Sequence, residues 1–138
     1  MKFKSALLCE QVRREDNGKL FFVGVYQENV LAYKFPLNYM LSFWVEAETT
    51  EKNNQLEFEI SVRPLKGGKK KIISKAELDI AFTEKNFIGN KARLNCLLDN
   101  IRIQFEEESL IIISGRKKGG RFKVIDSRAV IQHPNPPI

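Results

Sequence analysis

Two strands joined by a tight turn are predicted by residues 8–26, which read LCEQVRREDNGKLFFVGVY. The turn is Asp16-Asn17-Gly18, and Asn-Gly between apolar segments favours a hairpin because both residues tolerate positive φ. The second strand, Leu20 to Tyr26, is apolar along both of its faces. A strand of that kind is typical of the middle of a sheet whose two faces are covered. We therefore expect a β-rich domain with this hairpin at the centre of a sheet.

Later segments alternate apolar and polar residues with the period of a strand. Residues 39–49 and 55–63 show this pattern most clearly, and a polar, turn-rich connection separates them. The alternation predicts strands with one face against a core and one face in water. The short connection between the two predicts that they form a hairpin. Further strands are predicted over residues 72–82, 92–98, 101–105, 110–114 and 122–131.

Eight or nine short strands, at spacings of about ten residues, favour an all-β fold built as a two-sheet antiparallel sandwich. No segment of twelve residues has a helical period, so helix is expected only as a turn or two within residues 83–91. The alternation slips between Val124 and Ile125, which indicates a β-bulge. Residues expected on the inner faces are Phe22, Phe43, Val45, Phe58, Ile60, Leu78, Ile80, Ile103 and Ile112.

The length of 138 residues, with 43% apolar and 29% charged residues, is that of one globular domain. We place the sandwich at residues 1–131 and a proline-rich tail at residues 132–138, where proline cannot donate to a sheet. The formal net charge of +6 is compatible with an acidic partner, but only a basic patch on one face would argue for one.

The sequence gives no support for a metal-binding protein, a cofactor-dependent protein or a membrane protein. Cys9 and Cys96 lie in apolar contexts with one histidine in the whole chain, whereas a zinc site needs about four ligands. Buried free thiols are expected, with a Cys9–Cys96 disulfide left open. The first residues carry an apolar run of only three, too short for an export signal, and no run approaches a membrane span. These features predict a cytoplasmic protein without metal, cofactor or membrane partner.

The hairpin also carries a family resemblance. Its pattern is Cys9-Glu10-x-Val12-Arg13-x-Glu15-x-x-Gly18-Lys19, followed by Gly24-Val25-Tyr26. It resembles the N-terminal signature of an uncharacterised family of small bacterial proteins, and Phe35-Pro36 is similar to a second marker of that family. The resemblance covers roughly residues 6–45. It implies an immunoglobulin-like β-sandwich from bacteria or their phages, and it implies no activity.

No catalytic centre is predicted. The single histidine, His133, lies in the proline-rich tail, where nothing would hold it against a nucleophile. Carboxylates such as Glu57 and Glu59 alternate along a strand and belong to its wet face. The Gly67-Gly68 and Gly119-Gly120 pairs lie among basic residues, but strands flank them. A phosphate-binding loop would open a helix, so these are hairpin turns.

Two groups of residues could contact a partner. The two basic hairpin tips could bind nucleic acid or another polyanion, or could be solvated tips that guard sheet edges. In an antiparallel fold, successive loops lie at alternate ends of the sandwich. With nine strands counted, the two tips are expected at opposite ends, and a count that differs by one strand places them at the same end. The tips comprise Lys69, Lys70 and Lys71, and Arg116, Lys117, Lys118 and Arg121.

Trp44 is the second candidate, because it falls on the polar face of its strand. A large aromatic residue there often contacts another chain, although the alternative, a loop that covers Trp44 on a central strand, explains it more simply. The leading hypothesis is a non-enzymatic protein-interaction or assembly module that binds another protein or a second copy. The alternative is a polyanion binder that uses the basic tips.

Overall fold

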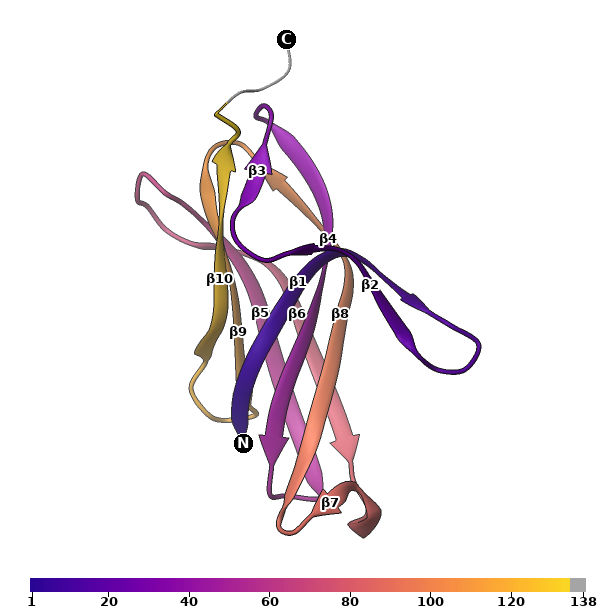
Figure 1. The fold of residues 1–138 in the computed structure, drawn as a ribbon. Coiled ribbons are helices and arrows are strands. Elements are labelled where there is room, and N and C mark those ends of the chain that lie inside the picture. Colours follow the sequence, from indigo (N-terminus) through magenta and orange to yellow (C-terminus); the bar gives the residue numbers. More distant parts are fainter. Residues whose placement is uncertain (135–138) are drawn as a thin grey trace.

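Residues 1–134 fold into two β-sheets that pack face to face, with five strands in each (Figure 1). The computed structural model describes residues 1–134. The first sheet has the order β2-β1-β4-β8-β7, and the second has the order β3-β10-β9-β5-β6. The strands are β1 (Lys2–Arg14), β2 (Leu20–Tyr26), β3 (Val30–Ala32), β4 (Leu37–Thr49), β5 (Asn53–Pro64), β6 (Lys71–Ala81), β7 (Phe87–Ile88), β8 (Lys91–Phe105), β9 (Ser109–Lys117) and β10 (Lys123–Gln132).

The all-β sandwich is confirmed, with ten strands in place of the eight or nine expected. All paired strands are antiparallel except β3 and β10, which are parallel. One 3-10 turn, η1 (Glu84–Asn86), lies in the segment where a helical turn is predicted. The additional strands β3 and β7 have three and two residues, too few to show a period in the sequence.

The core lies between the sheets and takes alternate residues from the central strands. Leu78 and Ile80 of the edge strand β6 are partly buried and pack against this core. The predicted residues that are fully buried are Phe43, Val45, Phe58, Ile60 and Ile103.

Two predicted core residues lie elsewhere. Ile112 is only half-buried on β9, whereas Ile111 and Ile113 point into the core. The run of apolar residues 110–113 has no alternation, so its inward positions cannot be read from the sequence. Phe22 lies outside the core, on the outer face of the first sheet, where its ring packs against Trp44.

The predicted hairpin between β4 and β5 is wrong, because these strands belong to different sheets. The short connection after Thr49 crosses from one sheet to the other. Thr49 Oγ1 donates a hydrogen bond to Asn54 Oδ1 at 2.6 Å, and Asn54 Nδ2 donates to the Glu51 carbonyl at 3.0 Å. Thr49 and Asn54 are both buried. Alternation within a strand does not distinguish such a crossing from a hairpin, since both need only a short polar connection.

The Asn-Gly turn forms as predicted, but the expected position of its second strand is wrong. Gly18 adopts φ +83°, and Gly18 N donates to the Glu15 carbonyl at 3.0 Å. β2 is the edge strand of the first sheet and pairs only with the second half of β1. We call residues 10–26, comprising that half of β1, the turn and β2, the arm. In Figure 1 the arm projects sideways from the sandwich.

Register shifts interrupt four of the described strand pairings, and two of them concern segments whose pattern the sequence shows. The bulge predicted in β10 is confirmed by a register shift between Val124 and Asp126. A second bulge lies where Ser42 opposes both Asp99 and Asn100, and it joins the two predicted segments 92–98 and 101–105 into the single strand β8. Ser42 Oγ donates a hydrogen bond to Asp99 Oδ1, and Asn100 adopts φ +54°.

Cys9 and Cys96 are buried and unbridged. Burial raises the pKa of both thiols, that of Cys96 to about 11, and Asp99 raises the pKa of Cys9 further. Both thiols therefore stay protonated near neutral pH. At the other end of the chain β10 ends at Gln132, and residues 135–138 of the predicted tail lie outside the described residues.

Candidate functional site

The arm is held in shape by contacts between its two strands. Gly24 adopts φ +67°, which favours glycine, and the Glu10 side chain lies directly over it. A Cβ at Gly24 would come within 2.9 Å of the Glu10 side chain. Tyr26 Oη donates a hydrogen bond to Glu10 Oε1 at 3.2 Å, and burial together with Glu10 raises the pKa of Tyr26. Residues of the quoted sequence pattern thus form one structural unit.

One face of the arm contacts an apolar cluster on the outside of the first sheet. Leu7, Trp44 and Leu97 lie side by side on β1, β4 and β8 and point away from the core. The Phe22 ring meets the Trp44 ring edge-on, with 5.5 Å between centroids. Trp44 is half-buried as a result. It lies on the outer face, where the alternation predicts it, and a side chain of the same chain covers part of it.

The other face of the arm is bare. Phe21, Val23 and Val25 are 53%, 40% and 39% exposed and alternate along β2, so they form one apolar stripe. On β1, Arg13 lies opposite Phe21 and Gln11 lies opposite Val23. The free edge of β2 runs beside this stripe, with backbone groups available for another strand.

β2 carries no charged residue between Leu20 and Tyr26, and the same is true of the shorter free edge formed by residues 37–41 of β4, beyond its pairing with β1. Charged residues on edge strands discourage pairing with other chains. Charged residues on the remaining free edges include Lys2 and Lys4 in β1, Lys71, Lys75, Glu77 and Asp79 in β6, Arg93, Asp99 and Arg102 in β8, and Lys123, Asp126 and Arg128 in β10.

The two basic tips lie at opposite ends of the second sheet. The first tip follows Pro64, which pairs with Ser109 at the start of β9, and the second tip begins at the end of β9. In the first tip, Lys69 and Lys71 line a cleft with Glu106 and Glu107. Acidic side chains thus lie beside these lysines, and the structure does not bring the two tips together.

In the second tip, two of the four basic residues are paired with carboxylates. Arg116 Nε donates to Glu57 Oε2 at 2.6 Å, and its guanidinium lies 4.2 Å from the centroid of the Phe122 ring. Lys117 Nζ lies 2.5 Å from Glu51 Oε2, and this hydrogen bond lowers the pKa of Glu51. Among residues 1–134, no ion pair involves Lys118 or Arg121.

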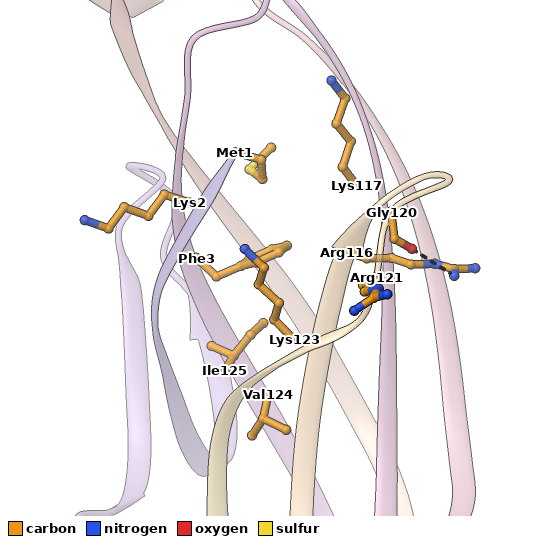
Figure 2. Close-up of a pocket in the computed structure, with 10 residues that line it drawn as sticks. All are labelled: Met1, Lys2, Phe3, Arg116, Lys117, Gly120, Arg121, Lys123, Val124 and Ile125. Atoms are coloured by element: carbon orange, nitrogen blue, oxygen red, sulfur yellow. Dashed lines mark hydrogen bonds between the residues drawn. The ribbon is translucent and has the colours of Figure 1, made fainter.

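A cleft of about 430 Å³ lies between the start of β1 and the second tip (Figure 2). Phe3 and Ile125 supply apolar surface inside it, and the Phe3 ring also packs on the core residue Phe58. Arg121 and Lys123 line the same cleft, and no carboxylate from residues 1–134 lines it. The second tip therefore presents free positive charge beside an apolar surface, which the isolated sequence of the tip did not indicate.

Comparison with known proteins adds a family. Residues 4–114 match a family described as of unknown function, DUF6941. The chain belongs to this family. The matched segment includes the arm, Trp44 and the first basic tip, and it ends before Arg116. No curated protein matches the sequence. The family is uncharacterised, as the resemblance implied, and the match itself assigns no activity.

Within residues 1–134, no helix is long and apolar enough to cross a membrane, and no three acidic, histidine or cysteine side chains are grouped as metal ligands. Of the two carboxylates assigned from the sequence to the wet face of a strand, Glu57 pairs with Arg116. The stripe on the arm was missed by sequence reasoning. Its signal is the two-faced apolar pattern of Leu20–Tyr26, which is equally typical of a central strand.

Proposed function

We propose that the protein is a non-enzymatic interaction module that binds a protein partner, or a second copy, through the arm. The observation that supports this is the bare stripe of Phe21, Val23 and Val25 beside an uncharged free edge. The sequence of β2 is that of a strand covered on both faces, whereas residues 1–134 cover only one of them. A partner strand added to the edge would supply backbone hydrogen bonds, and side chains over the stripe would supply specificity.

The finer classification is also a proposal. The order β1-β4-β8-β7 facing β10-β9-β5-β6 corresponds to the A-B-E-D and G-F-C-C′ order of immunoglobulin-like sandwiches, and this supports an immunoglobulin-like fold. The arm and β3 would then be an insertion after the first strand. The sequence resemblance supports a bacterial or phage origin, and the buried free thiols support a reducing compartment such as the cytoplasm.

The proposed role predicts that Val23→Lys removes binding while leaving the fold intact. Val23 is exposed on β2, so a lysine there adds charge to the edge without disturbing the core. With the purified protein as bait in extract of its source cells, we expect proteins retained by the wild type to be lost with Val23→Lys. Mass spectrometry of the retained proteins measures this.

The matched control is Val124→Lys. Val124 is the more exposed valine, at 64%, and lies on the free edge of β10, which already carries charge. Retention should survive this change. Equal retention by the wild type and Val23→Lys would show that the arm is not the binding surface.

Polyanion binding is the second candidate, and the cleft of Figure 2 is the observation that favours it. Four cations at this end have no ion pair among residues 1–134, namely Lys2, Lys118, Arg121 and Lys123. The first tip, which is beside acidic residues at the other end, would not share this footprint.

This second candidate makes a prediction about salt. If four cations contact phosphates, affinity for duplex DNA falls roughly 100-fold between about 50 and 200 mM salt. Gel shifts would measure it, and Arg121→Glu with Lys123→Glu should abolish the shift, whereas Lys69→Glu with Lys70→Glu should change it little. Binding through the arm instead responds weakly to salt and is unaffected by reversing these charges.

A further inference from the structure

We propose that the partner of the arm is a second copy of this chain, with β2 of each copy paired antiparallel about a twofold axis at Val23. This inference rests on the proposed function and names the molecule that binds the arm. The free edge of β2, its lack of charge and the order of its side chains carry the argument.

The absence of charged residues along β2 allows the β2 strands of two copies to pair with each other. Bringing two identical edges together places each charged residue near its own equivalent, which is unfavourable for lysine-bearing edges such as β6 and β10. Between Leu20 and Tyr26 there is no such residue, so self-pairing of β2 meets no repulsion along the strand.

A twofold axis perpendicular to the sheet restricts the register. Directly opposed residues in an antiparallel pair point to the same face, so odd-numbered residues must face odd-numbered residues of the second copy. Of the registers that satisfy this, only the one centred on Val23 pairs the whole of Leu20–Tyr26 with itself. Centring on Phe22 or Gly24 leaves strand ends unpaired.

The side chains fit this register. Phe21 faces Val25 of the second copy, an aromatic–β-branched pair of the kind that stabilises antiparallel strands. On the other face, Phe22 lies opposite Gly24 of the second copy, and it keeps its own contact with Trp44. On the exposed face the larger Phe21 thus meets the smaller Val25, and the stripe is partly covered by its own equivalent.

The test is disulfide trapping at the axis, performed on the full chain. In this register Val23 faces Val23, so Val23→Cys brings two thiols together, whereas Phe21→Cys separates them along the strand. Phe21 is the more exposed residue, so random collision would favour Phe21→Cys instead. Both variants carry Cys9→Ala, because Cys9 lies opposite Val25 on the neighbouring strand. With diamide as oxidant, we expect dimer from Val23→Cys and little from Phe21→Cys.

Sedimentation of the protein without added cysteines completes the test. We expect dimer at high protein concentration, loss of dimer in Val23→Lys and retention in Val23→Thr, which keeps the branched shape without charge. A dimer that persists in Val23→Lys would overturn the inference. A monomeric wild type with no trapping at Val23 would also overturn it. In that second case, Val23-dependent retention of other proteins would still support the proposed function with a different occupant.

Discussion

Replacing Phe58 with alanine is expected to lower the free energy of unfolding by about 3–5 kcal/mol, the usual cost of truncating a buried phenylalanine. Phe58 is 1% exposed at the centre of β5, and the Phe3 ring packs edge-on against it at 5.8 Å. Gly115 lies directly opposite on β9, where a Cβ would come within 3.0 Å of the Phe58 ring. The site is filled, so truncation leaves a cavity between the sheets.

Urea unfolding followed by circular dichroism measures this loss, and Phe21→Ala is the matched control. Phe21 is 53% exposed on the arm, so its truncation should cost less than about 1 kcal/mol. The two variants therefore separate stability from binding, because Phe58→Ala weakens the fold and Phe21→Ala weakens only contacts of the arm. Similar losses from both would contradict the placement of Phe58 in the core and of Phe21 on the surface.

The second large effect is expected at the crossing between the sheets, where Asn54→Ala should cost about 2–4 kcal/mol. Asn54 is buried, and its removal leaves the Thr49 hydroxyl and the Glu51 carbonyl without the hydrogen bonds it makes with them. Each buried polar group left unsatisfied costs about 1–3 kcal/mol.

The neighbouring residue provides the control for Asn54. Asn53 is exposed and has the same side chain, so Asn53→Ala should change stability by less than about 0.5 kcal/mol. Unfolding midpoints of the two alanine variants compare them directly. Equal effects would show that the amide of Asn54 does not hold the crossing.

Sequence patterns predicted the strands better than their partners. Alternation placed Phe43 and Phe58 inward because a half-buried strand must expose every second residue. The slip at Val124 revealed a bulge because an extra residue breaks that alternation. Pairing between sheets depends on contacts far apart in the chain, so nothing near Thr49 could show that β4 and β5 separate.

The candidate site was harder to predict for a physical reason. Trp44 was identified because a lone aromatic residue interrupts a polar face. The stripe on β2 could not be predicted, because the sequence pattern of an apolar strand face is the same whether its own chain or another chain covers that face. The sequence of the second tip also did not show which of its basic residues are paired. Glu57 of β5 pairs with Arg116, and Glu51, in the connection before β5, pairs with Lys117.

The arm is the most local part of this topology, and the order of folding events follows from that. A hairpin closed by a short turn forms in about 1–10 μs, whereas sandwiches built from distant strands fold in milliseconds to seconds. The pairing of β4 with β8 is of the second kind. Partly folded chains therefore display the uncharged edge of β2 well before the two sheets close. Refolding yield should then depend steeply on protein concentration, since immature chains share the surface that serves the finished molecule.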